Sequence, residues 1–198
     1  MAVAKKIRRI VFDIETTGAT GPGGAFDMSA QELTVVSIHD SKTDTYSSFF
    51  KDELPKLWGI LERADILIGY NSDHFDIPIL NKYYPGDLTK IKSIDLLKEV
   101  RNVLGRRLKL DNIAQATLGT GKIASGLDAV KWFAEGKLDL LREYCEDDVR
   151  VTKEVYEYAK KNKSLKYKDF DGVREVKLNP TKWEVIEDAP AITHTLPF

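Results

Sequence analysis

The chain has 198 residues, of which 42% are hydrophobic and 31% charged, and this composition predicts one globular domain with a substantial core. No run of eighteen apolar residues is present, so no membrane-spanning segment is expected. The net charge of −1 excludes general electrostatic attachment to nucleic acid, and any such binding would depend on local basic patches and a metal site.

Two features predict a cytoplasmic protein. Residues 1–9 are basic but contain no apolar segment of the kind found in secretory signals. The single cysteine, Cys145, has no partner for an internal disulfide, as is usual in a reducing compartment.

The first third of the chain predicts three strands in succession. Residues 7–15 are apolar on both faces, which is typical of a central strand. A glycine-rich loop at 18–24 follows and lacks the Gly-Lys-Ser/Thr ending of a phosphate-binding loop. Residues 33–38 and 43–50 alternate as strands and are joined by a short polar turn, which favours an antiparallel meander.

The middle of the chain alternates between strand and helix patterns. We expect a helix at 53–63, a buried strand at 66–68, a helix starting near Pro78, where proline is tolerated, and a strand at 91–94. Four further helices are expected, at 96–104, 110–118, 127–134 and 138–160. This order predicts an α/β fold, with a mixed β-sheet flanked by helices.

The C-terminal segment differs in pattern, and we divide the chain into a domain at 1–163 and an appendage at 164–198. Residues 165–176 alternate as a hairpin, with Asp171-Gly172 as the turn signal. Residues 179–198 contain three prolines and no clear period, which predicts an extended tail.

Three short acidic segments, at residues 12–18, 69–76 and 144–148, place carboxylates where core residues would be expected. On the predicted first strand Asp13 and Glu15 project from one face, because side chains alternate along a strand. Each acid alone has a structural explanation, as a strand end, a helix cap such as Asp76, or an ion-pair partner. Together they favour a site that gathers carboxylates around divalent cations.

The long helix gives the sharpest local argument. Its apolar stripe follows spacings of three and four through Leu141, Tyr144, Cys145, Asp148, Thr152, Val155 and Ala159. Asp148 interrupts this stripe, with Tyr144 one turn earlier on the same face. Asp147 points about 100° away by helical geometry and is not chosen.

The three segments resemble the motifs of the DEDD (DnaQ-like) 3′→5′ exonuclease superfamily. The first, Phe-Asp-Ile-Glu-Thr-Thr-Gly, is similar to the first motif of that family. The second, residues 69–76 followed by Pro78, resembles the form found in the proofreading domain of family B DNA polymerases. Tyr144-Cys145 with Asp148 resembles the tyrosine form of the third motif, since the histidine form would carry histidine where this chain has Glu143. Residues 108–114 are also similar to those proofreading domains and to related stand-alone exonucleases.

The resemblance covers about residues 7 to 160 and implies a ribonuclease H-like fold. It further implies a two-metal 3′→5′ exonuclease that releases nucleoside 5′-monophosphates, with Mg²⁺ as the ion and Mn²⁺ as a substitute. The metal ligands would be four carboxylates: Asp13, Glu15, Asp76 and Asp148. Tyr144 would be catalytic with them and would orient the attacking water.

The resemblance also implies a pocket for the 3′-terminal nucleotide. Asn71 and Phe75 would shape this pocket, and Thr16 and Thr17 would offer backbone or hydroxyl groups to the terminal sugar. For Phe75, core packing is the stronger alternative.

The expected substrate is the 3′ end of single-stranded DNA, and two alternatives stay open. One is an exoribonuclease that uses the same site, and the other is a non-catalytic nucleic-acid-binding module. The form of the second motif tilts the prediction toward DNA rather than RNA. The candidate pathways are DNA repair, proofreading in trans and salvage.

Two further surfaces are candidates for contacts. Basic residues cluster at 101–109 and at 160–168, the latter with Tyr167 and Phe170 as candidate stacking residues, although solvated helix ends explain these clusters equally well. The terminal residues 195–198 distantly resemble short tails that bind sliding clamps.

Overall fold

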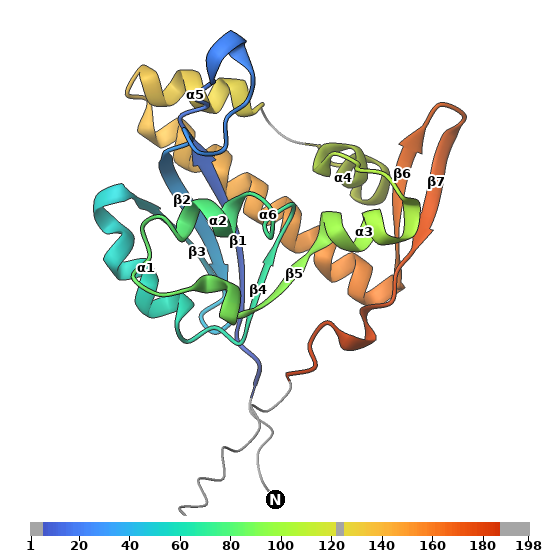
Figure 1. Cartoon of the computed structure of the whole chain (residues 1–198). Helices are drawn as coiled ribbons and strands as arrows, with labels where there is room; N and C mark the ends of the chain where they lie inside the picture. The colour runs from blue at the N-terminus through green and yellow to red at the C-terminus, as the bar shows by residue number, and fades with distance from the viewer. Residues whose placement is uncertain (1–5, 122–124, 187–198) are drawn as a thin grey trace, which may run out of the picture.

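A computed structural model describes residues 6–121 and 125–186 of the chain. Its centre is a five-stranded sheet with the strand order β3-β2-β1-β4-β5 (Figure 1). Neighbours β1, β2 and β3 are antiparallel, whereas β4 and β5 run parallel to β1, so the predicted meander and mixed sheet are confirmed. The strands are β1 Arg9–Thr16, β2 Leu33–Asp40, β3 Thr45–Phe50, β4 Ile66–Gly69 and β5 Lys92–Asp95.

Six α-helices flank this sheet in the described part of the chain. They are α1 Leu54–Leu61, α2 Asp76–Leu80, α3 Leu96–Leu104, α4 Leu110–Leu118, α5 Gly126–Ala134 and α6 Leu138–Asn162. Four short 3₁₀ turns accompany them: η1 Pro22–Gly24, η2 Lys51–Glu53, η3 Leu88–Lys90 and η4 Pro180–Lys182. None of the helices seen in these residues has the length and apolar character needed to cross a membrane.

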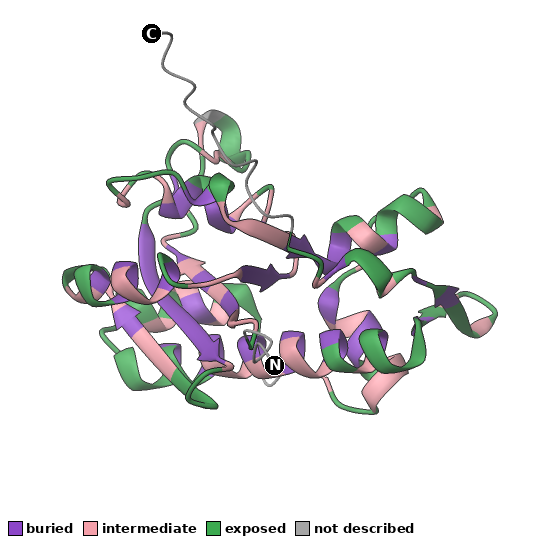
Figure 2. Cartoon of the chain, turned by 90° about the horizontal axis from the view of Figure 1, so that it is seen from below, coloured by how far each residue is buried: buried purple, intermediate pink, exposed green. Residues whose placement is uncertain are grey.

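The sheet is apolar on both faces, as the central strand predicts. Side chains on one face of β1 join a cluster with α1 and α2, while Val11 on the other face packs with α3, α4 and α6. Figure 2 shows buried residues concentrated in the sheet and on the helix surfaces turned toward it. Both layers therefore hold β1 rigidly, and a side chain on β1 has a defined position.

The C-terminal hairpin consists of β6 Ser164–Asp169 and β7 Gly172–Lys177. Asp169 pairs with Gly172, so the two turn residues are Phe170 and Asp171, and the expected Asp171-Gly172 turn was wrong by one residue. Gly172 instead adopts φ +122° as the first paired residue of β7, a conformation that glycine accommodates readily.

The hairpin shares a hydrophobic cluster with α4 and α6, to which it contributes Leu165, Tyr167 and Val176. Tyr167 is therefore buried, and of the two candidate stacking residues only Phe170, fully exposed at the turn, presents its ring to solvent. The division of the chain at residue 163 stays a prediction.

The segment after the hairpin returns to the main body. Trp183 stacks on Tyr156, with 5.7 Å between ring centroids, and its Nε1–H donates to Glu99 at 3.0 Å. Its neighbour Glu184 accepts hydrogen bonds from three donors: Arg9, Tyr156 and Lys160. Residues 195–198, the candidate clamp-binding tail, lie outside the described residues.

Candidate active site

Strand β1 continues past the end of its partner β4 and carries two acids there. Parallel pairing with β4 ends at Val11–Ile68. Because side chains alternate, Asp13 and Glu15 share the face of Val11, which is the face covered by α6. The intervening Ile14 points to the opposite layer.

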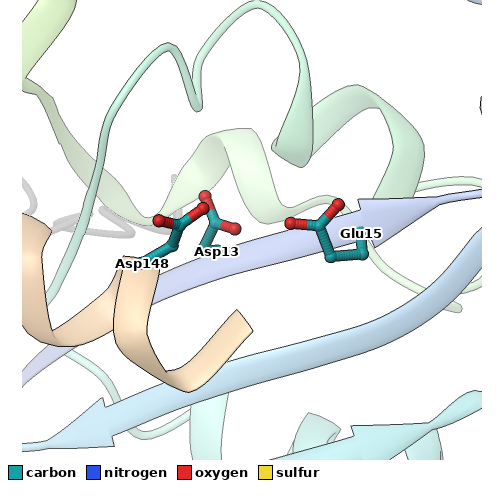
Figure 3. A group of neighbouring side chains, drawn as sticks. All are labelled: Asp13, Glu15 and Asp148. Carbon is teal, nitrogen blue, oxygen red and sulfur yellow. The ribbon is translucent and has the colours of Figure 1, made fainter. Parts of the chain in front are cut away.

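Helix α6 adds a third carboxylate to this pair. Asp13, Glu15 and Asp148 each place a carboxylate oxygen within 4.8 Å of the other two (Figure 3). Asp148 is 2% exposed, and the two strand acids are half-buried. The grouping joins residues more than 130 positions apart in the chain, so it exists only in the folded protein.

The chemistry of these three side chains fits a divalent metal ion. Two unit charges at this separation repel by about 3–4 kcal/mol at an effective dielectric near 20, and a cation between them offsets that cost. Carboxylate oxygens are the ligands that Mg²⁺ prefers in proteins. The Asp13, Glu15 and Asp148 cluster could therefore bind a metal ion.

The stripe of α6 explains why Asp148 rather than its neighbour reaches this group. All seven predicted stripe residues are buried: Leu141, Tyr144, Cys145, Asp148, Thr152, Val155 and Ala159. Asp147 instead turns aside and accepts hydrogen bonds from Arg150, with 3.0 Å between its Oδ1 and the arginine Nε.

Tyr144 lies beside the acids, and its phenolic hydroxyl has a raised pKa. Burial raises the pKa of Tyr144 well above its ordinary value, and the negative charges of Asp148, Glu15 and Asp13 raise it further. A hydrogen bond with Asp148 acts in the same direction. The ring of Trp132 meets Tyr144 edge-on, with 6.1 Å between centroids. A phenol in this setting keeps its proton at neutral pH and can donate a hydrogen bond.

Asp76 is the first residue of α2 and is buried, but it lies outside the group of three. Burial raises the pKa of Asp76 to about 8, and the charges of Asp95 and Asp148 add to this. Without a cation nearby, burial therefore favours the neutral form of this carboxyl, and a bound cation would favour its charged form. Its predicted role as a metal ligand stays a prediction.

Sequence reasoning missed Asp95, which organises the neighbouring loop. Its buried carboxylate accepts four backbone N–H groups, two from the turn after β4 and two from the first turn of α3. The donors are Asn71 at 2.8 Å, Asp73 at 3.2 Å, Leu97 at 2.9 Å and Lys98 at 3.2 Å. An aspartate at a strand-to-helix junction is a signal for a helix cap, which explains half of these contacts.

The turn held by Asp95 presents Asn71 to the site. Asn71 adopts φ +67°, a left-handed conformation that asparagine tolerates better than most residues. Gly69 permits this tight turn, since a Cβ there would lie 2.5 Å from the side chain of Ser72. The amide oxygen of Asn71 accepts a hydrogen bond from Arg107 at 2.7 Å. Arg107 belongs to the first basic stretch, but its place beside Asn71 has no signal in the sequence.

The remaining predicted substrate residues make contacts within the protein. The Thr16 hydroxyl donates to Gln31 at 3.0 Å, and the Thr17 N–H donates to the carbonyl of Glu32 at 3.0 Å. Their predicted contacts with a terminal sugar stay predictions.

Phe75 is half-buried and packs against the cluster formed with α1 and α2. Its ring also lies 6.0 Å from that of Phe26, which is 62% exposed. Core packing thus explains much of Phe75, and its predicted place in the terminal pocket stays a prediction.

A cleft of about 780 Å³ opens beside the acids. Asp13 and Tyr144 line one part of it, and Asn71 and residues 107–111 line another. One acid of the candidate metal-binding group, a phenol and two cationic side chains, Arg107 and Lys109, therefore line one cleft.

This chain is similar to a known protein family and to a solved structure. A family model described as the RNase_H superfamily matches residues 10–160. Among solved structures, the chain is similar to the family B DNA polymerase from the hyperthermophilic archaeon Pyrobaculum calidifontis, with a TM-score of 0.61 and 18% identity. That match covers 78% of this chain and 24% of the polymerase, so the chain spans about a quarter of that protein's length. Comparison with curated proteins finds no match.

Proposed function

This chain belongs to the RNase_H superfamily, and we propose that it is a metal-dependent 3′→5′ exonuclease of the DEDD superfamily's tyrosine subclass. The observation that carries the proposal is the meeting of Asp13, Glu15 and Asp148, since Asp13 and Tyr144 line one open cleft. An acidic group of this kind suits phosphodiester hydrolysis, in which negative charge develops on the attacking and leaving oxygens.

The four acids would together hold two Mg²⁺ ions. Asp13, Glu15 and Asp148 would hold the first ion, and Asp13 would share the second with the substrate, with Asp76 contributing partly through water. Bound in this way, the ions would supply Lewis-acid stabilisation to the scissile phosphate. Mn²⁺ would substitute, because it accepts the same oxygen ligands.

Tyr144 positions the nucleophile. Its hydroxyl keeps its proton, so it contributes a hydrogen bond that orients the attacking water and does not remove the proton from it. Burial of the ring against Trp132 limits the directions in which the hydroxyl can point.

The proposed substrate is the 3′ end of single-stranded DNA, from which nucleoside 5′-monophosphates are released. Asn71 and Phe75, with Thr16 and Thr17, would shape the pocket for the terminal nucleotide.

Degradation of end-labelled oligonucleotides tests the proposal. DNA and RNA 20-mers labelled at the 3′ or the 5′ end would be incubated with Mg²⁺, Mn²⁺ or chelator, with Asp13→Ala as control. We expect a metal-dependent ladder from the 3′ end of DNA that the substitution abolishes. A ladder on RNA alone would assign the same chemistry to RNA. No cleavage of either, with equal binding by both proteins, would leave a non-catalytic binding module.

A further inference from the structure

The catalytic cleft adjoins a second hollow that lies against the C-terminal hairpin. This hollow, of about 610 Å³, shares five lining residues with the cleft: Arg107, Leu108, Lys109, Asp111 and Gln115. Its outer wall comes from Lys168 and Val173, which face one another across the hairpin ladder and so lie on the same side of it. We call the cleft and the hollow together the channel, which has Asp13 at one end and the hairpin at the other.

Helix α4 fixes the hairpin in the place where it forms this wall. Asn112 donates to the carbonyl of Lys168 at 3.0 Å and accepts from its N–H at 2.9 Å. Thr117 makes the same pair of contacts with Lys166, at 2.9 Å each. These contacts satisfy the outer backbone groups of β6, which would otherwise be a free strand edge. The wall is therefore a built feature of the fold.

Away from Asp13, the charge along the channel is mainly positive. Arg107, Lys109 and Lys168 are all exposed, and Arg107 is held in place by Asn71. Asp111 is an acid among them and accepts a hydrogen bond from Gln115. Exposed cations spaced along a groove are the usual means by which proteins follow a nucleic-acid backbone.

Another hollow leaves the cleft along α3 and is less suited to a polyanion. It has a volume of about 650 Å³ and shares Arg107 with the channel. Its other cations are Lys98 and Arg101, and it also contains two acids, Asp73 and Asp95. Lys98 is paired with Asp73 at 2.8 Å, which leaves Arg101 as the cation that this hollow does not share with the channel. The hairpin channel is the better path.

We propose that the channel holds the single strand on the 5′ side of the scissile bond, with its phosphates on Arg107, Lys109 and Lys168. The inference rests on the proposed exonuclease function and extends it, because it assigns the hairpin to substrate binding. Strands long enough to reach the hairpin gain contacts that a single nucleotide cannot make.

Charge reversal in the channel tests the proposal. The Lys109→Glu/Lys168→Glu double variant would be compared with Lys161→Glu/Lys177→Glu, which makes the same change of charge at exposed lysines outside the channel. Two substrates would be used with each protein: a single-stranded DNA 20-mer and the p-nitrophenyl ester of thymidine 5′-monophosphate. Thermal midpoints would confirm that both variants are folded, and Lys168→Ala provides a milder change.

We expect the channel variant to raise KM for the 20-mer about tenfold or more and to leave hydrolysis of the nucleotide ester unchanged. The dependence of affinity for the 20-mer on salt should flatten by about 1.4 in slope, as for two lost single-strand phosphate contacts. The proposal is overturned if the channel variant and the control variant give equal KM values for the 20-mer.

Failure of the proposed function would look different. If wild type hydrolyses neither substrate, binding of a fluorescent 20-mer, measured by anisotropy, replaces the kinetic readout. A loss of affinity confined to the channel variant supports the channel even then, and equal affinities of the two variants overturn it. Reversal of Arg101 on α3 should change neither readout, and a tenfold loss there would place the strand along α3 instead.

Discussion

Strand β1 serves two layers of the molecule with opposite chemistry. Toward α1 and α2 it presents Ile10, Phe12 and Ile14, each at most 4% exposed. Toward α6 it presents Val11 and then Asp13 and Glu15, where the apolar pattern breaks. One face of this strand thus anchors it in the apolar core, and the other face supplies the carboxylates of the candidate site.

The comparison separates stability from activity along the chain. Apolar residues of the α1 layer should matter for folding and little for chemistry, and the acids of the α6 layer should do the reverse.

The largest effect is expected for Asp13→Asn. Loss of this carboxylate removes a candidate ligand, so the exonuclease rate should fall by about 10³-fold or more, equivalent to about 4 kcal/mol in the activation barrier. The thermal midpoint without metal should hold steady or rise, because a like charge is removed. Steady-state rates and calorimetry check both halves. A variant that unfolds more easily and keeps its rate would break the contrast.

Phe12→Ala tests the opposite layer. Removing a fully buried aromatic ring should lower the free energy of unfolding by about 3–5 kcal/mol. In a chain of this size that lowers Tm by about 10 °C. The rate per folded molecule should change less than tenfold, since the ring points away from the acids. Thr45→Ala, at an exposed position of β3, is the matched control, with an expected change below about 0.5 kcal/mol.

Tyr144→Phe sharpens the comparison within the α6 layer. It removes only the hydroxyl, so kcat should fall about 10- to 100-fold while stability changes by about 1 kcal/mol. Rapid-quench measurement of the chemical step on a DNA 20-mer provides the readout. Wild-type kcat in this variant would show that the hydroxyl does not orient the nucleophile.

Glu184→Gln probes the far end of α6, where polar contacts serve structure. Partial burial alone would raise the pKa of Glu184, but hydrogen bonds from Lys160, Tyr156 and Arg9 outweigh it and lower the pKa to about 2. A lowered folded-state pKa gives stability above the unfolded value near 4.5, and this contribution is lost as the pH falls toward 2. After allowance for solvent screening we expect a loss of about 1–2 kcal/mol at pH 7.

Urea unfolding at pH 7 and near pH 2 tests whether the stabilisation by Glu184 is lost as the pH falls. The variant and wild type should converge near pH 2, and exonuclease activity at pH 7 should stay within twofold of wild type. A difference in stability that grows as the pH falls would contradict the assignment.

Local patterns were enough to predict much of this molecule. The stripe of α6 follows from helical periodicity, which separates Asp148 from Asp147 without knowledge of the fold. Alternation on β1 likewise predicts that Asp13 and Glu15 share a face. Helical periodicity and strand alternation relate residues that are a few positions apart, so they predict which side chains within one element share a face.

Contacts between distant segments could not be predicted in the same way. The four bonds of Asp95 require β4 and β5 to be paired in one register, and the contact of Asn71 with Arg107 requires a left-handed turn as well. The hairpin turn was misplaced because Gly172 can serve either as a turn residue or as the first residue of β7, and propensity alone does not distinguish these.

The edge-on contact between Trp132 and Tyr144 has an optical consequence. Of the three tryptophans, Trp58 packs against Tyr84 and Trp183 against Tyr156, so Trp132 is the indole that contacts a proposed catalytic residue. A cation that enters the acidic group changes the electric field at this ring, and indole emission responds to such a field. Cation binding can therefore be followed by the intrinsic fluorescence of Trp132, and Trp132→Phe should abolish the change in emission.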